Sequence, residues 1–303
     1  MCSEYETENR LLLDSALVKQ LALQVGFHAC GIARAQKASD FGERLSRWLA
    51  DGRQADMHYM ERNASMRVDP TELVPGAKSV ISLLLGYKPS RRMQGDRLIA
   101  YYAYGEDYHA VIKGMLFKLI ALIKDNCPDF EAKPCVDTVP ISDKYWAYMA
   151  GLGWRGRNTL LINPKLGSFC NIAELVTTSE ADHYDSPMVD GCAGCTKCWQ
   201  ACPNNALGDG GLDARRCTAY HTIESHASEL PKNLKRNGYI FGCDCCQVVC
   251  PYNIRSQEVR DMDDEQMRRL QSLPDIAESD FKKATKGSPL SRIDYNQWRR
   301  NQS

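Results

Sequence analysis

Apolar residues recur at helical spacing in two long segments of the chain, residues 11–25 and 110–123. The first segment places Leu13, Leu17, Leu21 and Val25 on one face. The second places Val111, Met115, Leu119 and Leu122 on one face. Gly26 directly follows the first segment and is a common helix stop. A shorter helix is predicted over 143–150, and apolar positions between Met262 and Leu273 indicate helices near the C-terminus.

Short runs rich in apolar and β-branched residues predict strands between these helices. The predicted strands cover 27–33, 79–85, 160–162 and 174–177, with a short extended piece over 134–140. The run 79–85 is ended by Gly86 and Pro89. Helices and strands are mixed without a regular alternation, which predicts an α+β fold for residues 1–180. A polar stretch over 181–190 that contains Pro187 predicts a linker.

Charge and hydropathy exclude several classes of protein. Lys plus Arg and Asp plus Glu each number 38, so the net charge near zero does not indicate a nucleic-acid-binding protein, although a local basic patch stays open. The chain shows no signal-peptide pattern and no apolar run of roughly 18 residues, the length that a membrane span needs. We therefore expect a cytoplasmic protein that does not contact the membrane.

Cysteine is the residue type with the strongest pattern, because most of the 14 cysteines fall in one third of the chain. One run has the spacing C-x2-C-x2-C-x3-C-P, and its cysteines are Cys192, Cys195, Cys198 and Cys202. In two-cluster ferredoxins, three cysteines of such a run hold one [4Fe–4S] cube and the fourth ligates the other cube. A second half-motif contains Cys243, Cys246 and Cys250 before Pro251, and Cys217 between the two halves supplies the missing thiolate.

The spacing predicts two complete clusters with exchanged ligands. Cluster one would be held by Cys192, Cys195, Cys198 and Cys250, and cluster two by Cys202, Cys217, Cys243 and Cys246. Zinc is the competing interpretation of paired C-x2-C motifs, but it does not account for the two Cys-Pro endings. Cys246 is preferred to its neighbour Cys245 because of the C-x2-C spacing from Cys243. The scattered cysteines are interpreted as incidental thiols; they are Cys2, Cys30, Cys127, Cys135 and Cys170.

The residues around the cysteines resemble those of epoxyqueuosine reductases. The resemblance rests on 191–203, 212–217, 222–224 and 241–247, and on N-terminal segments. These N-terminal segments are 26–33, 57–62, 105–109, 136–140 and 151–159. The resemblance covers roughly residues 11–300 and lacks the C-terminal helical-repeat domain of longer members. Several positions depart from the family pattern, including Glu106, Cys170 and His221.

This resemblance implies reduction of epoxyqueuosine to queuosine at the tRNA wobble position, by an enzyme that uses cobalamin and two [4Fe–4S] clusters. It predicts three parts: a mixed α/β cobalamin-binding domain (1–180), a ferredoxin-like two-cluster module (181–258) and a short helical tail (259–303). The D-x-H-x-x-G cobalamin pattern is only half present, since Asp56 and His58 are followed by Glu61 where glycine belongs. Cobalamin is therefore implied by the resemblance alone.

The resemblance also assigns roles to single residues. Asp137 matches the general acid, which would need a raised pKa to protonate the departing epoxide oxygen; a turn aspartate that caps Thr138 is the structural alternative. Arg62, Tyr220 and Asp244 match positions near cobalamin, with a surface ion pair or packing around the clusters as the alternatives. His109, beside Tyr108, fits acid–base chemistry or a structural helix start about equally.

Partners follow from the same interpretation: an anticodon stem–loop of tRNA, an external electron donor, and a chain that acts as a monomer. Aromatic residues at 101, 102 and 104 suit either base stacking or a core. Basic residues of the tail with Trp298 suit phosphate contacts or a solvated helix face; they are Lys282, Lys283, Lys286, Arg292, Arg299 and Arg300. One rival function is a reductive dehalogenase, although those proteins usually begin with a twin-arginine export signal and this sequence shows none. The other is a non-catalytic ferredoxin-like electron carrier.

Overall fold

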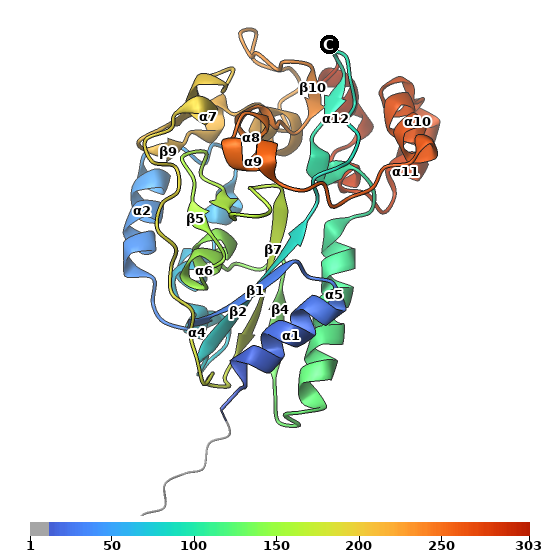
Figure 1. The fold of residues 1–303 in the computed structure, drawn as a ribbon. Helices are drawn as coiled ribbons and strands as arrows, with labels where there is room; N and C mark the ends of the chain where they lie inside the picture. Colours follow the sequence, from blue (N-terminus) through green and yellow to red (C-terminus); the bar gives the residue numbers. More distant parts are fainter. Residues whose placement is uncertain (1–11) are drawn as a thin grey trace, which may run out of the picture.

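A four-stranded antiparallel sheet forms the centre of the N-terminal half of the computed structural model, which describes residues 12–303. Its strand order is β1-β2-β7-β4 (Figure 1). These strands are β1 (Ala29–Arg34), β2 (Ser79–Gly86), β7 (Cys170–Thr177) and β4 (Ala132–Cys135). The remaining strands form separate two-stranded sheets. These pair β10 (Tyr239–Phe241) with β3 (Leu98–Ile99), β5 (Trp154–Arg155) with β6 (Leu161–Ile162), and β8 (Leu207–Gly208) with β9 (Gly211–Leu212).

The α-helices are distributed along the whole chain. They are α1 (Ser15–Val25), α2 (Ser39–Ala50), α3 (Ala64–Val68), α4 (Pro70–Leu73), α5 (Tyr108–Lys124), α6 (Asp143–Met149), α7 (Lys197–Gln200), α8 (Cys245–Val248), α9 (Pro251–Arg255), α10 (Asp264–Ser272), α11 (Glu278–Thr285) and α12 (Tyr295–Arg300). None of the helices in this part of the chain combines the length and apolar character of a membrane span.

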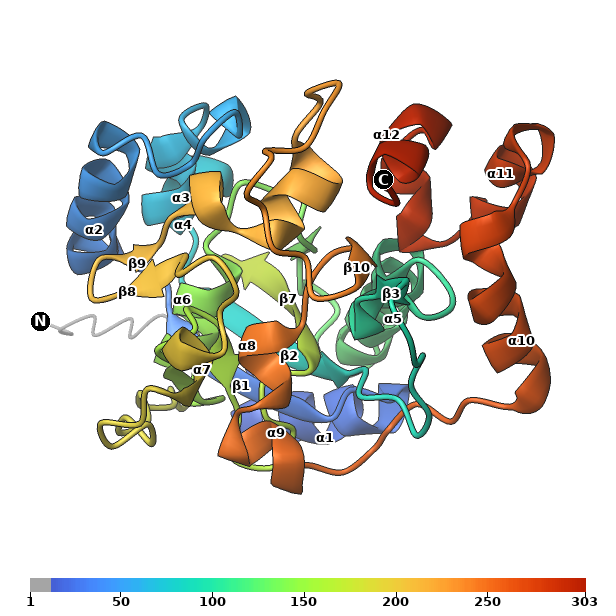
Figure 2. The same ribbon diagram turned by 90° about the horizontal axis from the view of Figure 1, so that it is seen from above.

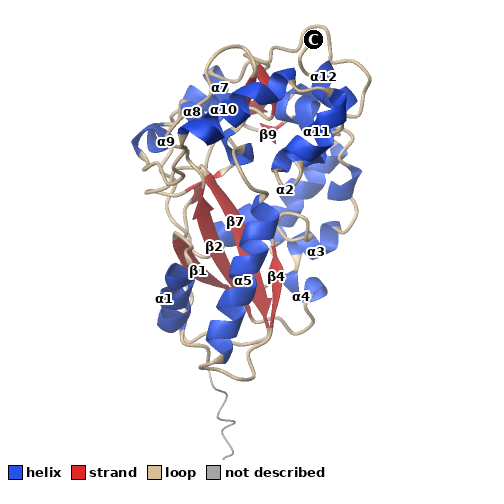
Figure 3. Cartoon of the chain, turned by 90° about the vertical axis from the view of Figure 1, so that its right-hand side faces the viewer, coloured by secondary structure: helices blue, strands red, loops and turns tan. Residues whose placement is uncertain are grey.

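Strand periodicity explains how the sheet is covered on both faces. Ile81 and Leu83 of β2 point into a core shared with α1 and α5, whereas Val80 and Leu84 point into a core shared with α6. Successive side chains of a strand face opposite sides, so an unbroken apolar run fits a strand buried on both faces. The views in Figures 1 and 3 show α1 and α5 beside this sheet.

The predicted α+β fold is confirmed, with local corrections. The first helix begins at Ser15 after the N-cap Asp14, and Leu13 instead forms a β-bridge with Ala181. Leu11 and Cys2 lie outside the described residues. The predicted face of the second helix was correct at Leu119 and wrong by one residue at its other three positions: the buried residues are Ile112, Leu116, Leu119 and Ile123. Neighbouring apolar residues blur the helical period there, and only the packing decides which stripe is buried.

The cysteine-rich segment and the tail lie together over one end of the central sheet (Figures 1 and 2). Their hydrophobic core also includes residues from the N-terminal half, such as Tyr87, Ile99 and Phe169, packed with Phe281 and Trp298. The predicted three-part division therefore remains a proposal about segments of the chain, because one core joins residues from all three. This arrangement brings the end of the sheet next to the cysteines.

Candidate functional site

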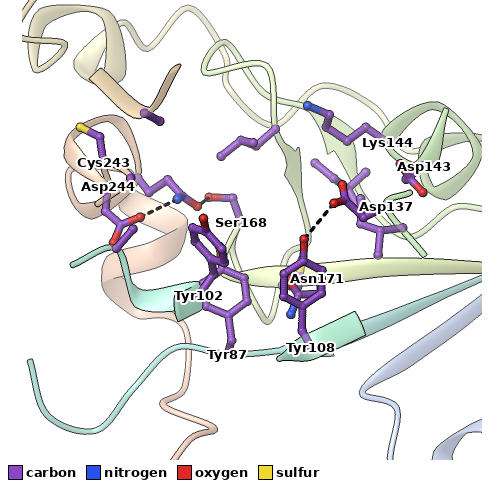
Figure 4. Close-up of a pocket in the computed structure, with 18 residues that line it drawn as sticks. Tyr87, Tyr102, Tyr108, Asp137, Asp143, Lys144, Ser168, Asn171, Cys243 and Asp244 are labelled. Carbon is purple, nitrogen blue, oxygen red and sulfur yellow. Dashed lines mark hydrogen bonds between the residues drawn. The ribbon is translucent and has the colours of Figure 1, made fainter. Parts of the chain in front are cut away.

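An open pocket of about 290 Å³ lies where the sheet meets the cysteine-rich segment. Cys243 and Asp244 line one side of this pocket, and Asp137 and Asp143 line the opposite side (Figure 4). Tyr102, Tyr108 and Asn171 also contribute to the lining. The predicted acid residue and one predicted cluster ligand, more than 100 positions apart in sequence, thus face one cavity.

Asp137 lies in a turn directly after β4 and has a positive φ of 47°. Aspartate accepts this left-handed conformation more readily than most residues, because its short polar side chain can bond locally. The Asp137 side chain is 55% exposed, and its Oδ2 atom receives a hydrogen bond of 3.0 Å from the Tyr108 hydroxyl. The turn therefore points the carboxylate out of the sheet and toward the pocket.

A histidine connects this carboxylate to the start of α5. Asp107 is the N-cap of α5 and accepts a hydrogen bond from the His109 backbone N–H. The imidazole places Nδ1 at 2.7 Å from Asp107 Oδ1 and Nε2 at 3.1 Å from Asp137 Oδ2. Two carboxylates therefore hold the imidazole ring: His109 lies in the first turn of α5, next to the N-cap Asp107, and it also contacts Asp137, which lines the pocket.

The pKa values of His109 and Asp137 depend on each other. The hydrogen bond to Asp137 is the main cause that raises the pKa of His109, with Asp107 adding to it. The hydrogen bond from His109 is the main cause that lowers the pKa of Asp137. The prediction that the Asp137 pKa is raised was therefore wrong for this conformation, because the sequence did not reveal an imidazole partner.

Asp244 is buried, with 1% of its surface exposed, and both its oxygens are used within the protein. Oδ2 accepts from the Tyr101 backbone N–H at 2.8 Å, and Oδ1 accepts from Gln247 Nε2 at 3.0 Å (Figure 4). Burial raises its pKa to about 7. Asp244 thus ties the loop that carries Cys243 to the aromatic segment 101–104.

The predicted cluster-one cysteines come from both half-motifs and lie close together. The charges of Cys192 and Cys250 both act on Cys198 and, after burial, raise its pKa. Cys192 and Cys250 also pack with Trp154, Ile162 and Tyr252, which form an apolar shell on that side. The exchange of ligands between the two half-motifs is therefore compatible with the fold.

The predicted cluster-two cysteines converge in the same way. The charges of Cys217 and Cys202 both act on Cys246 and raise its pKa, together with burial as the main cause. The thiols of Cys245 and Cys243 are in hydrogen-bond contact, and Asn237 Nδ2 lies 3.8 Å from the Cys245 sulfur. Within residues 12–303, no three Cys, His, Asp or Glu side chains converge on one point where a single metal ion would be held.

The remaining predicted cofactor residues lie in different environments. Tyr220 begins a π-helical turn, and its hydroxyl donates to Asp56 Oδ2 at 2.6 Å. The half-present D-x-H motif is thereby attached to the cysteine-rich segment beside Cys217. Arg62 is exposed and does not belong to the residues that line the pocket. The structure therefore brings Asp137 and Asp244 to one pocket and leaves Arg62 outside its lining.

The aromatic segment and the tail divide between core and surface. Tyr101 and Tyr104 are buried in the core, whereas Tyr102 lines the pocket. In the tail, Trp298 is fully buried, and Arg300 donates hydrogen bonds to backbone carbonyls of Ser225, Ala227 and His221. The interpretation of Trp298 and Arg300 as tRNA contacts is therefore wrong, because their partners are in the protein.

Several pocket residues were not singled out from the sequence. Cys170, interpreted as an incidental thiol, lines the pocket, and burial raises its pKa to about 12, so the thiol stays protonated. Asp143 and Lys144 also line the pocket. Asp143 begins α6, and a charged residue at the start of a helix is too common to indicate a site. Only the contact of α6 with the sheet places it there.

Two family descriptions match the chain. Residues 67–138 match the family described as "Epoxyqueuosine reductase QueG, DUF1730", and residues 191–253 match the "4Fe-4S double cluster binding domain". The first range contains Asp107, His109 and Asp137, and the second contains all the predicted cluster cysteines. The iron–sulfur interpretation of the cysteine-rich segment is thereby confirmed at the level of the domain.

Curated relatives are similar over nearly the whole chain. An epoxyqueuosine reductase of Cellulophaga algicola is 38% identical over 296 residues, which cover 95% of this chain and 96% of the relative. One of Gloeobacter violaceus is 37% identical and covers 95% and 94%, respectively. The Escherichia coli enzyme is 34% identical, and the match covers 94% of this chain but 78% of that relative.

Solved structures show the same fold. The epoxyqueuosine reductase of Streptococcus thermophilus superimposes with a TM-score of 0.85 at 27% identity, covering 94% of this chain and 79% of that one. An epoxyqueuosine reductase crystallised with an epoxyqueuosine-modified tRNA stem–loop gives a TM-score of 0.80 at 27% identity, with the same coverage. The identity and coverage of the curated relatives, together with this fold, show that the chain belongs to the epoxyqueuosine reductase family.

Proposed function

We propose that this protein reduces epoxyqueuosine to queuosine at the wobble position of tRNA. The observation that carries the proposal is the shared pocket, in which the proposed cluster ligand Cys243 and Asp137 face one cavity, with His109 in contact with Asp137. Removing an epoxide oxygen requires both electrons and protons at the same carbon–oxygen bonds, so the two sources must meet at one site. The tRNA-bound relative supports the choice of substrate.

Cobalamin is part of this proposal, and the pocket has features that suit it. The Asn171 side-chain amide lines the pocket, and its Nδ2 atom is buried without a hydrogen-bond partner, as is that of Asn158. An unpaired buried donor is costly unless a ligand satisfies it, and the carboxamide groups of cobalamin are suitable acceptors. Asn171 and Tyr102 would contact the group, while Asp244 and Tyr220 would hold the loops around it. When bound, cobalamin supplies a strongly reducing cobalt centre.

The electron path follows from the position of the cysteines. Cys243 lines the pocket, so cluster two, held by Cys202, Cys217, Cys243 and Cys246, would be the cluster adjacent to the substrate. Cluster one, held by Cys192, Cys195, Cys198 and Cys250, would accept electrons from an external donor. We further propose that the protein acts in the cytoplasm as a monomer, with tRNA as its macromolecular substrate.

The protein's own groups supply the proton chemistry. The His109 imidazolium holds a proton next to Asp137 Oδ2, and the Tyr108 hydroxyl fixes the same oxygen. As negative charge develops on the epoxide oxygen, the pair transfers its proton through Asp137, which projects into the pocket. A wobble base lies in a single-stranded loop, so moving it into the pocket against Tyr102 costs little stacking.

Anaerobic turnover tests the function. The cluster-loaded protein would be mixed with cobalamin, a strong reductant and tRNA bearing epoxyqueuosine, and the nucleosides would be weighed by mass spectrometry. We expect loss of one oxygen atom, and a loss of turnover on the order of 100-fold or more in Asp137→Asn. Asp129→Asn, at an exposed position, is the control and should match the wild type. Intact tRNA with both cofactors verified would refute the proposal.

A further inference from the structure

A second pair of carboxyl groups lies behind the pocket wall, and its inner member, Glu174, has no cationic partner among the described residues. Glu174 sits within β7 with 0% of its surface exposed, and neither of its carboxylate oxygens has a hydrogen-bond donor among the described residues. Asp143 Oδ1 is likewise buried without a donor. A fully buried carboxylate without a counter-charge is strongly disfavoured, so such groups keep a proton.

The two groups face each other for a clear structural reason. Glu174 has the same orientation as Val176, which packs in the core beneath α6, while Ala173 and Leu175 face the opposite core. Asp143 is the first residue of α6 and lies over this face. Asp143 and Glu174 each act on the pKa of the other, so the two carboxyl groups lie in close contact, and a hydrogen bond between them requires a proton on one of them.

No cation among the described residues acts on Glu174, whereas the neighbouring Lys144 acts on Asp143 from the pocket side. Glu174 is in register with Ser82 on β2 and Cys135 on β4, both uncharged, and the Ser82 hydroxyl is also buried without a partner. The charged groups that act on Asp143 from outside are Asp137 and Lys144, which line the pocket. Burial is the main cause that raises both pKa values, that of Asp143 to about 6; the charge of Asp137 adds to the rise at Asp143, and Asp143 adds to the rise at Glu174.

The exposure of the pair is graded from the interior to the pocket. Glu174 is completely enclosed, whereas Asp143 keeps one oxygen buried and contributes other atoms to the pocket lining (Figure 4). A proton shared by the pair therefore has one route to the substrate, through Asp143. Like-charged carboxyls in close contact share a single proton, because ionising both is unfavourable.

We propose that Asp143 and Glu174 share one proton and supply it through Asp143 to the pocket, as the second proton of the reaction. This inference rests on the proposed function, in which an epoxide, two electrons and two protons give an alkene and water. Two carbon–oxygen bonds break, one carbon–carbon π bond forms, and the oxygen leaves with two new O–H bonds. The electrons come from the external donor. The His109–Asp137 pair supplies one proton, and Asp143 supplies the other.

Glu174 is a positioning residue in this scheme, because it does not reach the pocket and acts by holding the proton against Asp143. After transfer the pair carries two negative charges in a buried setting, which is unfavourable, and it regains a proton from solvent through the pocket. Turnover would then depend on the pair most strongly at high pH, where protons are scarce.

Infrared spectroscopy and turnover together test the proposal. At neutral pH, the wild type should show the C=O stretch of a protonated carboxyl that shifts in deuterated water. Glu174→Gln preserves the shape but cannot hold the shared proton, and it should lose this band. Its kcat should fall on the order of 100-fold, with an unchanged KM, an intact cluster spectrum and a steeper loss of turnover as pH rises.

Two further variants keep the test decisive. Asp143→Asn changes a partly exposed position and covers the case in which Glu174→Gln does not fold; it should give the same kinetic result. Glu131→Gln, at a side chain 77% exposed, should leave both the band and the pH profile unchanged. Persistence of the infrared band in both Glu174→Gln and Asp143→Asn would overturn the shared proton. Loss of the band with a wild-type pH profile would overturn the proton supply.

Failure of the proposed function would look different. If the wild type converts no epoxyqueuosine, the function is wrong and the supply of a second proton falls with it. The infrared band of the wild type and its loss in Glu174→Gln would still be measured without substrate, and they would show whether the pair holds a proton.

Discussion

His109 Nε2 lies 3.1 Å from Asp137 Oδ2, and this contact joins the start of a helix to a turn at the end of a strand. The two residues are 28 positions apart, and neither is part of the cysteine pattern. Because the imidazole also contacts Asp107, the helix N-cap sets the position of the ring. In the proposed reaction, the proton would be held by a group whose location depends on how α5 packs against β4.

The first prediction concerns the pKa of His109. Its ordinary value of 6.5 is raised in the folded protein by the hydrogen bond to Asp137, with a further contribution from Asp107. Since the folded value exceeds the unfolded one, the stabilisation from this contact is fully present below pH 6.5 and is lost as the pH rises through the raised pKa. NMR titration of the imidazole should show this elevated midpoint.

The Asp137→Asn variant is the matched test for that titration. It removes the largest cause of the shift while keeping the shape of the side chain, so the His109 midpoint should move down. Asp129→Asn, at an exposed position, should leave the midpoint where it is in the wild type. An unchanged midpoint in Asp137→Asn would show that the two groups do not interact in solution.

The second prediction concerns stability against pH. The pKa values of Asp143 and Glu174 are both raised by burial, so the folded state binds more protons than the unfolded state above the ordinary carboxyl range. The free energy of unfolding should therefore fall as the pH rises from about 4 toward and beyond neutrality. In Glu174→Gln this slope should be smaller, so the variant gains stability relative to the wild type as pH increases.

Urea unfolding at several pH values measures this difference. Glu131→Gln is the control, because its exposed side chain should leave the slope unaltered. Parallel slopes for the wild type and Glu174→Gln would contradict the raised pKa values.

The third prediction separates two adjacent cysteines. Cys246 lies among Cys217, Cys202 and Cys198, whereas Cys245 bonds to Cys243 and contacts Asn237. Cys246→Ser should lose cluster two, and with it about half of the bound iron. Cys245→Ser should retain the full iron content. Iron analysis and electron paramagnetic resonance of the reduced proteins measure both; the reverse pattern would exchange the two assignments.

The fourth prediction concerns the tail. Arg300 donates hydrogen bonds to the backbone oxygens of Ser225, Ala227 and His221. Arg300→Met removes these donors, although the Ser225 carbonyl keeps the one from Gln297 Nε2, and it should lower the free energy of unfolding by about 1–3 kcal/mol per acceptor left without a donor. Lys282→Glu, on an exposed side chain, should change stability by less than about 0.5 kcal/mol.

Binding of tRNA is the companion measurement for the tail. Lys282→Glu with Lys283→Glu tests whether the exposed basic residues contact the phosphate backbone. If they do, binding should weaken and become less dependent on salt. Wild-type stability in Arg300→Met would contradict a structural role for Arg300.

Local spacing determined a large part of what is known about this protein. The two half-motifs with Cys217 between them predict two clusters, because the C-x2-C spacing brings neighbouring thiolates to the same cube. The strand 79–85 was also predicted closely, as β2 covers Ser79–Gly86, since a run buried on both faces is apolar at most positions. Such features depend on residues near each other in sequence.

Only the tertiary structure decided the properties that depend on contacts between distant segments. Apolar residues flank each other in α5, so packing selected Ile112 rather than Val111 for the core. Trp298 and Arg300 looked suited to nucleic acid until their buried partners were located. Asp137 was expected to have a raised pKa, but His109 lowers it. Burial is the main cause that raises the pKa of Glu174, and the neighbouring Asp143 adds to it. A pKa reflects the local dielectric and the nearest charges, and these are set by folding.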